Sequence, residues 1–165
     1  MRLLILLGIL IMTNVNAANF ILTSHSFKNN EKIPIKYTCA GNDISPQLSW
    51  QGAPKATKSF ALICADPDAV SGTFYHWVVF NMPLTLSSIK ENQNLLDSVI
   101  GENSTGQQAY KGPCPPPGKI HHYIFTVYAL DTQLNLPMDT NAEKLIAAMQ
   151  GHILETADLI GLFSK

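Results

Sequence analysis

Three apolar runs of strand length constrain the fold of this chain more than any other feature of its sequence. They cover residues 59–65, 76–83 and 123–130, and turn-forming residues separate them. The first run is almost continuously apolar, which is typical of a central strand that is covered on both faces. The third run alternates, so that Tyr123 and every second residue after it share one face of a strand. We therefore expect these runs to form the central strands of the fold.

Shorter segments with strand character come before the three long runs. They are residues 19–23, 32–38 and 48–50. The segment 32–38 contains Pro34, which cannot donate a hydrogen bond to a neighbouring strand and therefore suits an edge strand. Many short strands at regular spacing predict a mainly β fold, arranged as a sandwich.

Two regions depart from this pattern. Residues 84–111 are polar, and we expect a long excursion over the surface, because this segment cannot bury a core of its own. Residues 142–150 contain strong helix formers, and Gly151 can end a helix in the left-handed conformation. Residues 152–163 fit either a helix or a closing strand, so we expect one or two helices near the C-terminus.

The first 17 residues have the pattern of a signal peptide. Met1 and Arg2 are followed by an apolar run over residues 3–12, and Ala17 ends a small-residue cleavage motif. The apolar run is shorter than the roughly 20 residues that span a bilayer. We predict a signal peptide over residues 1–17 and a single exported domain over residues 18–165, located in the periplasm or secreted.

Charge and cysteine content narrow the function classes. The chain has 11 basic and 12 acidic residues without runs of either sign, which argues against a nucleic-acid interface. Cys64 lies inside an apolar run and is expected to be a buried, unpaired thiol. Cys39 and Cys114 lie in loops beside glycine and proline, and in an oxidising compartment we expect them to form a disulfide.

Polar side chains gather at the ends of the apolar runs. Asp66 and Asp68 follow the first run, His76 opens the second, and His121 and His122 precede the third. Each feature alone is common, because Asp-Pro-Asp is a turn device and a single histidine at a strand end is usually solvated or satisfied in the core. Together they place several polar groups where the strands leave the sheet, which is where binding chemistry is usually found.

A stiff loop leads into the two histidines. Residues 112–118 set a run of prolines between Gly112 and Gly118, which fixes a loop with few backbone donors. The glycines allow close backbone approach, the imidazoles supply donors, and a tyrosine such as Tyr110 or Tyr123 can add a hydroxyl group. This set of groups suits an anion site, for example one for a phosphate monoester that carries an amine.

Other chemistries fit the sequence less well. Histidine and aspartate are legitimate metal ligands, but the closely spaced motifs of dedicated metal sites are absent from the sequence, and we expect neither a metal nor another cofactor. The sequence has no Gly-x-Ser-x-Gly motif, and Cys64 lies within a strand rather than in an activating environment. Asp66 and Asp68 could form a glycosidase-like carboxylate pair, but the proline between them makes that geometry unreliable.

Several motifs together resemble the phosphatidylethanolamine-binding protein family, and within it the bacterial branch that is similar to the Raf kinase inhibitor protein. The resemblance extends from about residue 26 to residue 164. The segments that carry it are residues 37–39 (Tyr-Thr-Cys), residues 43–50 (Asp-Ile-Ser-Pro-x-Leu-Ser-Trp), residues 66–69 (Asp-Pro-Asp-Ala) with His76 and Asn81, and residues 112–118 with His121 and Tyr123.

The resemblance implies a β-sandwich of two antiparallel sheets with a small anion-binding pocket at one end. Members of the family bind phosphorylated head groups, phosphate-like anions or nucleotides, some regulate kinases or inhibit proteases, and no catalytic activity is common to them. The residues that match the family's pocket, or shape its wall, are Asp66, Asp68, His76, Gly112, His121 and Tyr123.

Two positions depart from the family pattern. Val70 stands where the family usually has proline, which predicts a looser or more apolar pocket rim. His122 stands where arginine is common. Because side chains alternate along a strand, we expect His122 to point away from His121 and out of the pocket.

These observations predict an exported, non-catalytic binding protein with a small pocket for phosphate-like anions or phosphorylated head groups. No nucleic-acid partner and no stable membrane insertion are expected. One alternative is a secreted inhibitor or modulator of a protein partner, such as a protease or a kinase pathway, acting through loops such as 84–111. A second is a hydrolase that uses Asp66 and His76 as its acid and base.

Overall fold

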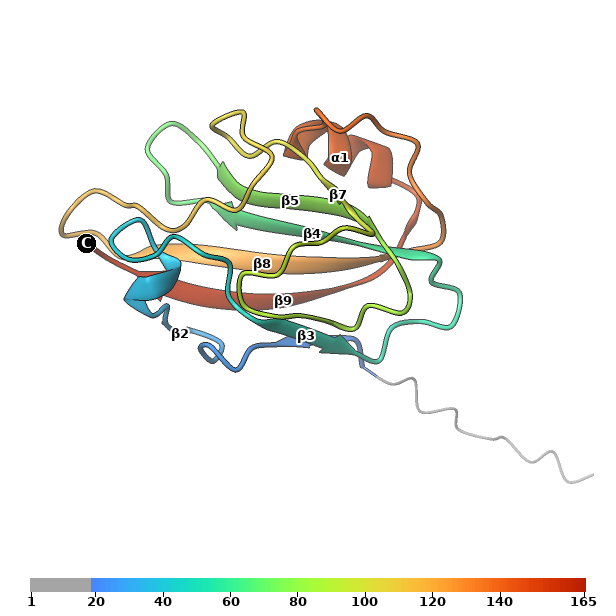
Figure 1. Cartoon of the computed structure of the whole chain (residues 1–165), viewed down its shortest axis with the longest axis horizontal. Coiled ribbons are helices and arrows are strands. Elements are labelled where there is room, and N and C mark those ends of the chain that lie inside the picture. Colours follow the sequence, from blue (N-terminus) through green and yellow to red (C-terminus); the bar gives the residue numbers. More distant parts are fainter. Residues whose placement is uncertain (1–18) are drawn as a thin grey trace, which may run out of the picture.

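The computed structural model describes residues 19–165, so the predicted signal peptide lies outside the described residues. Two sheets pack face to face, and one short helix covers the outer face of the larger sheet (Figure 1). The larger sheet has the strand order β2-β9-β8-β4-β5-β7, and the smaller has the order β1-β3-β6. The prediction of a mainly β sandwich is confirmed.

The strands of the larger sheet are β2 (Glu31–Lys32), β4 (Ser59–Asp66), β5 (Phe74–Met82), β7 (Val99–Ile100), β8 (His121–Leu130) and β9 (Ile153–Phe163). Those of the smaller sheet are β1 (Ile21–Thr23), β3 (Leu48–Gln51) and β6 (Ser88–Ile89). Neighbouring strands are antiparallel, except that β2 pairs with β9 in parallel.

Strand β4 is covered on both faces, as its continuous apolar run predicts. Phe60, Leu62 and Cys64 face the core between the two sheets. Ala61 and Ile63 face a second apolar cluster beneath the helix. Cys64 is fully buried and forms no disulfide, which agrees with its predicted state.

The helix α1 (Ala142–Met149) supplies the cover for the outer face. Its fully buried residues Leu145 and Met149 pack into the second cluster, and the Asn141 side chain caps its first turn by accepting a hydrogen bond from the Lys144 amide at 3.0 Å. Gly151 follows with φ of 81°, the left-handed conformation expected at this helix end. Residues 153–163 resolve the open alternative, because they form strand β9 rather than a second helix.

The predicted edge strand over residues 32–38 is wrong in most of its length. Strand β2 ends at Lys32, and Pro34 precedes a 3-10 helix, η1 (Ile35–Tyr37). Pro34 has φ of −58°, which suits a helical start, and its carbonyl accepts a hydrogen bond from the Tyr37 amide at 3.0 Å. Residues 35–37 therefore form a helical turn, although their alternating apolar pattern is typical of a strand.

The polar segment 84–111 lies over the sandwich and contributes only the two-residue strands β6 and β7. Its apolar residues Ile89 and Leu95 are buried in the core between the sheets, and their packing holds the segment against the sandwich. Between residues 19 and 165, no helix has the length and apolar character needed to cross a membrane.

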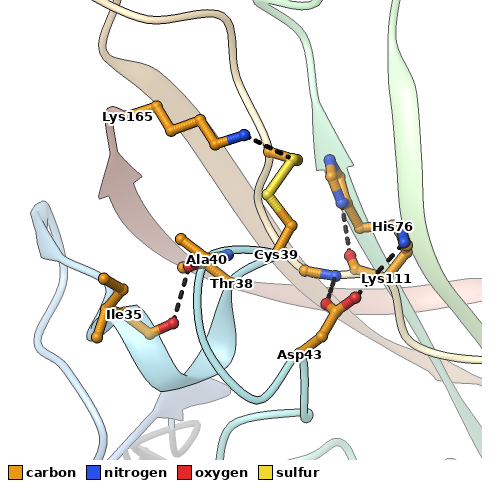
Figure 2. Close-up of a disulfide and its surroundings, with 10 residues drawn as sticks. Ile35, Thr38, Cys39, Ala40, Asp43, His76, Lys111 and Lys165 are labelled. Atoms are coloured by element: carbon orange, nitrogen blue, oxygen red, sulfur yellow. Dashed lines mark hydrogen bonds and ion pairs between the residues drawn. A yellow bond between two sulfur atoms is a disulfide. The ribbon is translucent and has the colours of Figure 1, made fainter.

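A disulfide joins Cys39, just after η1, to Cys114 in the proline-rich loop, as predicted (Figure 2). The Cys39 amide also donates a hydrogen bond to the Pro113 carbonyl oxygen at 3.1 Å. The two loops are far apart in the sequence, since the cysteines are 75 positions apart, and these two links fix them against each other.

We predict that a Cys39→Ser, Cys114→Ser double variant is less stable than the wild type by up to about 4 kcal/mol, because the disulfide closes a long loop in the unfolded chain. Chemical denaturation with and without a reductant measures this difference. The reductant should lower the stability of the wild type to that of the variant and leave the variant unchanged. Three free thiols in a non-reducing mass measurement of the exported protein would contradict the pairing.

Candidate functional site

Three strand ends meet at one end of the larger sheet. Because β4 is antiparallel to both of its neighbours, the end of β4 lies beside the starts of β5 and β8, and Ala65 pairs with both Tyr75 and Ile124. Figure 1 shows the loops 67–73 and 111–120 at this same end of the molecule. A cavity of about 220 Å³ lies between them. It is lined by Asp66, Ala69, Val70, Phe74, His76, Lys111, Gly112, Cys114, Pro116 and His121.

A β-bulge turns His76 toward this cavity. Cys64 pairs with Trp77, but the next residue, Ala65, pairs with Tyr75, so His76 is an extra residue in β5. Trp77 faces the core between the sheets, and simple alternation would put His76 on the opposite face. The bulge cancels that alternation, and His76 lines the cavity with only 4% of its surface exposed.

The His76 ring is held by a backbone hydrogen bond. Its Nδ1 donates to the Lys111 carbonyl oxygen at 2.6 Å (Figure 2). Its Nε2 is buried and has no hydrogen-bond partner among residues 19–165. The rings of Phe74 and Tyr123 pack against it, with centroids 4.6 and 5.1 Å away. Burial lowers the pKa of His76, which favours the neutral imidazole.

Asp66 and His121 form a buried pair beside His76. His121 Nδ1 donates to Asp66 Oδ2 at 2.7 Å, and both side chains are almost fully buried. The other carboxylate oxygen, Oδ1, accepts a hydrogen bond from the Asp68 amide at 2.9 Å. Both oxygens of Asp66 are therefore engaged within the protein, and the pair fixes the orientation of the His121 ring.

Asp68 does not line the cavity, although the sequence placed it in the candidate set. Its carboxylate accepts hydrogen bonds from the backbone amide and from Nδ1 of His122, at 2.8 and 2.7 Å. These bonds lower the pKa of Asp68. His122 is exposed and points out of the cavity, as strand alternation predicts. Asp68 and His122 thus form a second aspartate–histidine pair outside the first.

Tyr123 lies behind the cavity wall. Its side chain is fully buried, and its hydroxyl group has no hydrogen-bond partner within the described chain. Burial, and to a smaller extent the charge of Asp66, raises the pKa of the phenol, so the hydroxyl keeps its proton. It can therefore support the two histidine rings, and it is not among the residues that line the cavity.

Lys111 and Asp43 were not among the site residues predicted from the sequence. The Gly112 amide donates to Asp43 Oδ1 at 2.6 Å, and the Lys111 ammonium lies 3.5 Å from Asp43 Oδ2. Lys111 lines the cavity, while Asp43 holds the loop from behind. Asp43 appeared only as part of a family motif, and a single lysine before Gly112 carries no motif of its own. The contact between their loops exists only in the folded chain.

The remaining wall of the cavity is apolar. Ala69, Val70, Phe74 and Pro116 line it, and Val70 is 82% exposed at the rim. Val70 thus forms part of the cavity rim, where a looser or more apolar rim was expected, and its effect relative to proline stays a prediction. Among residues 19–165, no three His, Cys, Asp or Glu side chains come together in a set that could hold a metal ion.

The protein is therefore a two-sheet β-sandwich with a small cavity at its strand ends. Buried histidines and a carboxylate form part of the cavity wall. The family model "Phosphatidylethanolamine-binding protein" matches residues 23–164, and the chain belongs to this family. The family expectation from the sequence motifs is confirmed.

Relatives and solved structures agree with this assignment. A protein of Methanothermobacter thermautotrophicus, named "UPF0098 protein", is 48% identical over 149 residues, which cover 87% of this chain and 98% of the relative. The crystal structure of the phosphatidylethanolamine-binding protein homologue CT736 from Chlamydia trachomatis has a TM-score of 0.85 at 38% identity, covering 90% of this chain and 99% of that one. The structure of E. coli YbcL has a TM-score of 0.82 at 31% identity, covering 88% and 98%.

We predict that Gly112→Ala destabilises the protein by about 2 kcal/mol, because the added methyl group has no room. It would lie 2.5 Å from both Asp43 Oδ1 and the Tyr37 carbonyl oxygen. Chemical denaturation measures the loss. Ala109→Ser, which adds one atom at an exposed position of the preceding segment, serves as the control and should unfold like the wild type. Wild-type stability of Gly112→Ala would show that the loop is not packed as described.

Proposed function

We propose that this chain binds small phosphate-like anions or phosphorylated head groups in the cavity at the end of β4, β5 and β8, without acting as a catalyst. The observation that carries the proposal is the buried, unpartnered Nε2 of His76 in the wall of a cavity that His121 and Lys111 also line. A buried polar atom without a partner costs about 1–3 kcal/mol, and a ligand in the cavity would recover this cost.

The charges of the wall support an anionic ligand. Lys111 supplies an ammonium group, and its ion pair with Asp43 is long at 3.5 Å and partly exposed, so it can turn to a second anion. Both oxygens of the Asp66 carboxylate already accept a hydrogen bond within the protein, from His121 and from the Asp68 amide. His121 is left with its second ring nitrogen for a ligand.

The size and lining of the cavity limit the ligand. A volume of about 220 Å³ lies below the roughly 300–1,000 Å³ of pockets that take drug-sized molecules. Val70, Phe74 and Pro116 offer an apolar wall beside the polar one. This combination suits a phosphoryl group with a short organic substituent rather than a large ligand.

The same geometry disfavours the alternative of a hydrolase that uses Asp66 and His76 as acid and base. Asp66 is paired with His121, and its side chain is only 5% exposed, so it cannot exchange protons freely with a substrate. His76 uses its Nδ1 to hold the Lys111 carbonyl. The two residues therefore have separate hydrogen-bond partners, which supports binding rather than hydrolysis.

The proposal predicts a change in the histidine NMR signals on titration with millimolar O-phosphorylethanolamine. The ring signals of His76 and His121 should shift, while those of His25 and His152, which do not line the cavity, should stay in place. His121→Ala should weaken binding about tenfold or more, which corresponds to about 1.4 kcal/mol, and the exposed control His152→Ala should not.

Absence of any shift of His76 and His121 at millimolar ligand would overturn the anion-binding proposal. A biological activity that survives in a His76→Ala, His121→Ala double variant would instead favour action on a protein partner through loops such as 84–111. Action on a protein partner stays a prediction, and the double variant distinguishes it from anion binding.

We also propose that the chain is exported and cleaved after Ala17. The pattern of residues 1–17 and a disulfide with an exposed Cys114 both support an oxidising compartment. N-terminal sequencing of the protein from expressing cells should give a chain that starts at Ala18. A chain that retains Met1 in the cytosolic fraction would contradict this proposal.

A further inference from the structure

His76 presents an acceptor, not a donor, to a ligand in the cavity. Its Nδ1 lies 2.6 Å from the Lys111 carbonyl oxygen, which can only accept, so Nδ1 carries a proton. In a neutral imidazole the other nitrogen, Nε2, then carries a lone pair. Figure 2 shows this second nitrogen on the edge of the ring that faces away from Lys111. It is buried and has no partner among the residues the structure describes.

The surroundings favour the neutral form of this ring in the free protein. The side chain is 4% exposed, and burial is the strongest influence on its pKa, which is lowered. The Lys111 carbonyl and the charges of Asp66 and Asp43 act in the opposite direction and less strongly. The titratable groups around the ring are Asp66 from β4, His121 and Tyr123 from β8, and Lys111 and Asp43 from the two joined loops.

A fully deprotonated anion offers only acceptors, so its oxygen and the Nε2 lone pair of His76 would repel each other. We propose that the cavity takes up one proton with each phosphoryl group it binds, and that this proton lies between His76 Nε2 and a ligand oxygen. This inference rests on the proposed function, and it names the form of the ligand: a phosphate monoester that arrives protonated, or whose dianion binds together with a proton from solvent.

The source of the proton depends on pH. The second pKa of a phosphate monoester is about 6. Below that value the ligand brings its own proton as a P–OH group, which donates to Nε2. Above it the ligand is a dianion, and the proton comes from solvent when the complex forms. A sulfate monoester stays deprotonated in this range, so with that ligand the proton must reside on the protein, and the proposal places it on His76.

The test is the pH dependence of the dissociation constant of methyl phosphate, measured by titration calorimetry from pH 5 to pH 9. The Kd should change little between pH 5 and 5.5, and should rise about tenfold per pH unit between pH 7 and 9. Calorimetry in buffers of different ionisation enthalpy counts the protons directly, and we expect about one proton taken up at pH 8 and close to none at pH 5.

The His76→Gln variant tests whether the bound proton lies on His76. The glutamine amide places a permanent donor near the position of Nε2, so the Kd for methyl phosphate should change less than about threefold between pH 7 and 9. The matched control is His152→Gln, at an exposed histidine that pairs with Asp131 and does not line the cavity. It should keep the tenfold dependence of the wild type.

Nitrogen-15 NMR of the wild-type protein with methyl sulfate at pH 8 tests the same point without a variant. Both ring nitrogens of His76 should be protonated in the complex and only Nδ1 in the free protein. A flat Kd between pH 7 and 9, an unprotonated Nε2 in the complex, or a tenfold dependence that persists in His76→Gln would each overturn the inference and leave the proposed function standing. No binding of methyl phosphate at millimolar concentration at any pH would overturn both.

Discussion

The antiparallel pairing of β4 with both β5 and β8 is the constraint on which the rest of the structure depends. It brings the end of β4 next to the starts of its two neighbours, so that Asp66, His76 and His121 converge at one end of the sheet. As a central strand, β4 also contacts an apolar cluster on each face. Leu62 faces the smaller sheet, and Ile63 faces the helix. Core and site are therefore products of one arrangement of strands.

The polar groups of the site are stable because they are buried in pairs. Separating Asp66 from His121 would leave a charge or a polar ring without a partner, at a cost of about 3–5 kcal/mol. His76 differs, since only one of its ring nitrogens is satisfied. Among the residues that line the cavity, His76 supplies the buried side-chain atom without a hydrogen-bond partner, whereas the unpaired hydroxyl of Tyr123 lies behind the wall.

The loop side of the cavity is fixed by covalent and electrostatic links rather than by a sheet. The disulfide between Cys39 and Cys114 and the hydrogen bond from the Gly112 amide to Asp43 hold the proline-rich loop against the segment after η1. The Lys111 carbonyl in this loop then orients the His76 ring. The geometry of the histidine thus depends on a contact between two loops that are distant in sequence.

Periodicity and turn chemistry are local properties of the chain, so they were enough to predict the sandwich class, the three long strands, the helix before Gly151 and the exclusion of His122 from the cavity. The sequence also brought Asp66, His76, Gly112 and His121 into one candidate site. The folded chain alone reveals that a bulge turns His76 inward, that Asp68 pairs with His122, and that Asp43 and Lys111 belong to the loop contact. These depend on strand register and on loops meeting in space, and no local pattern encodes either.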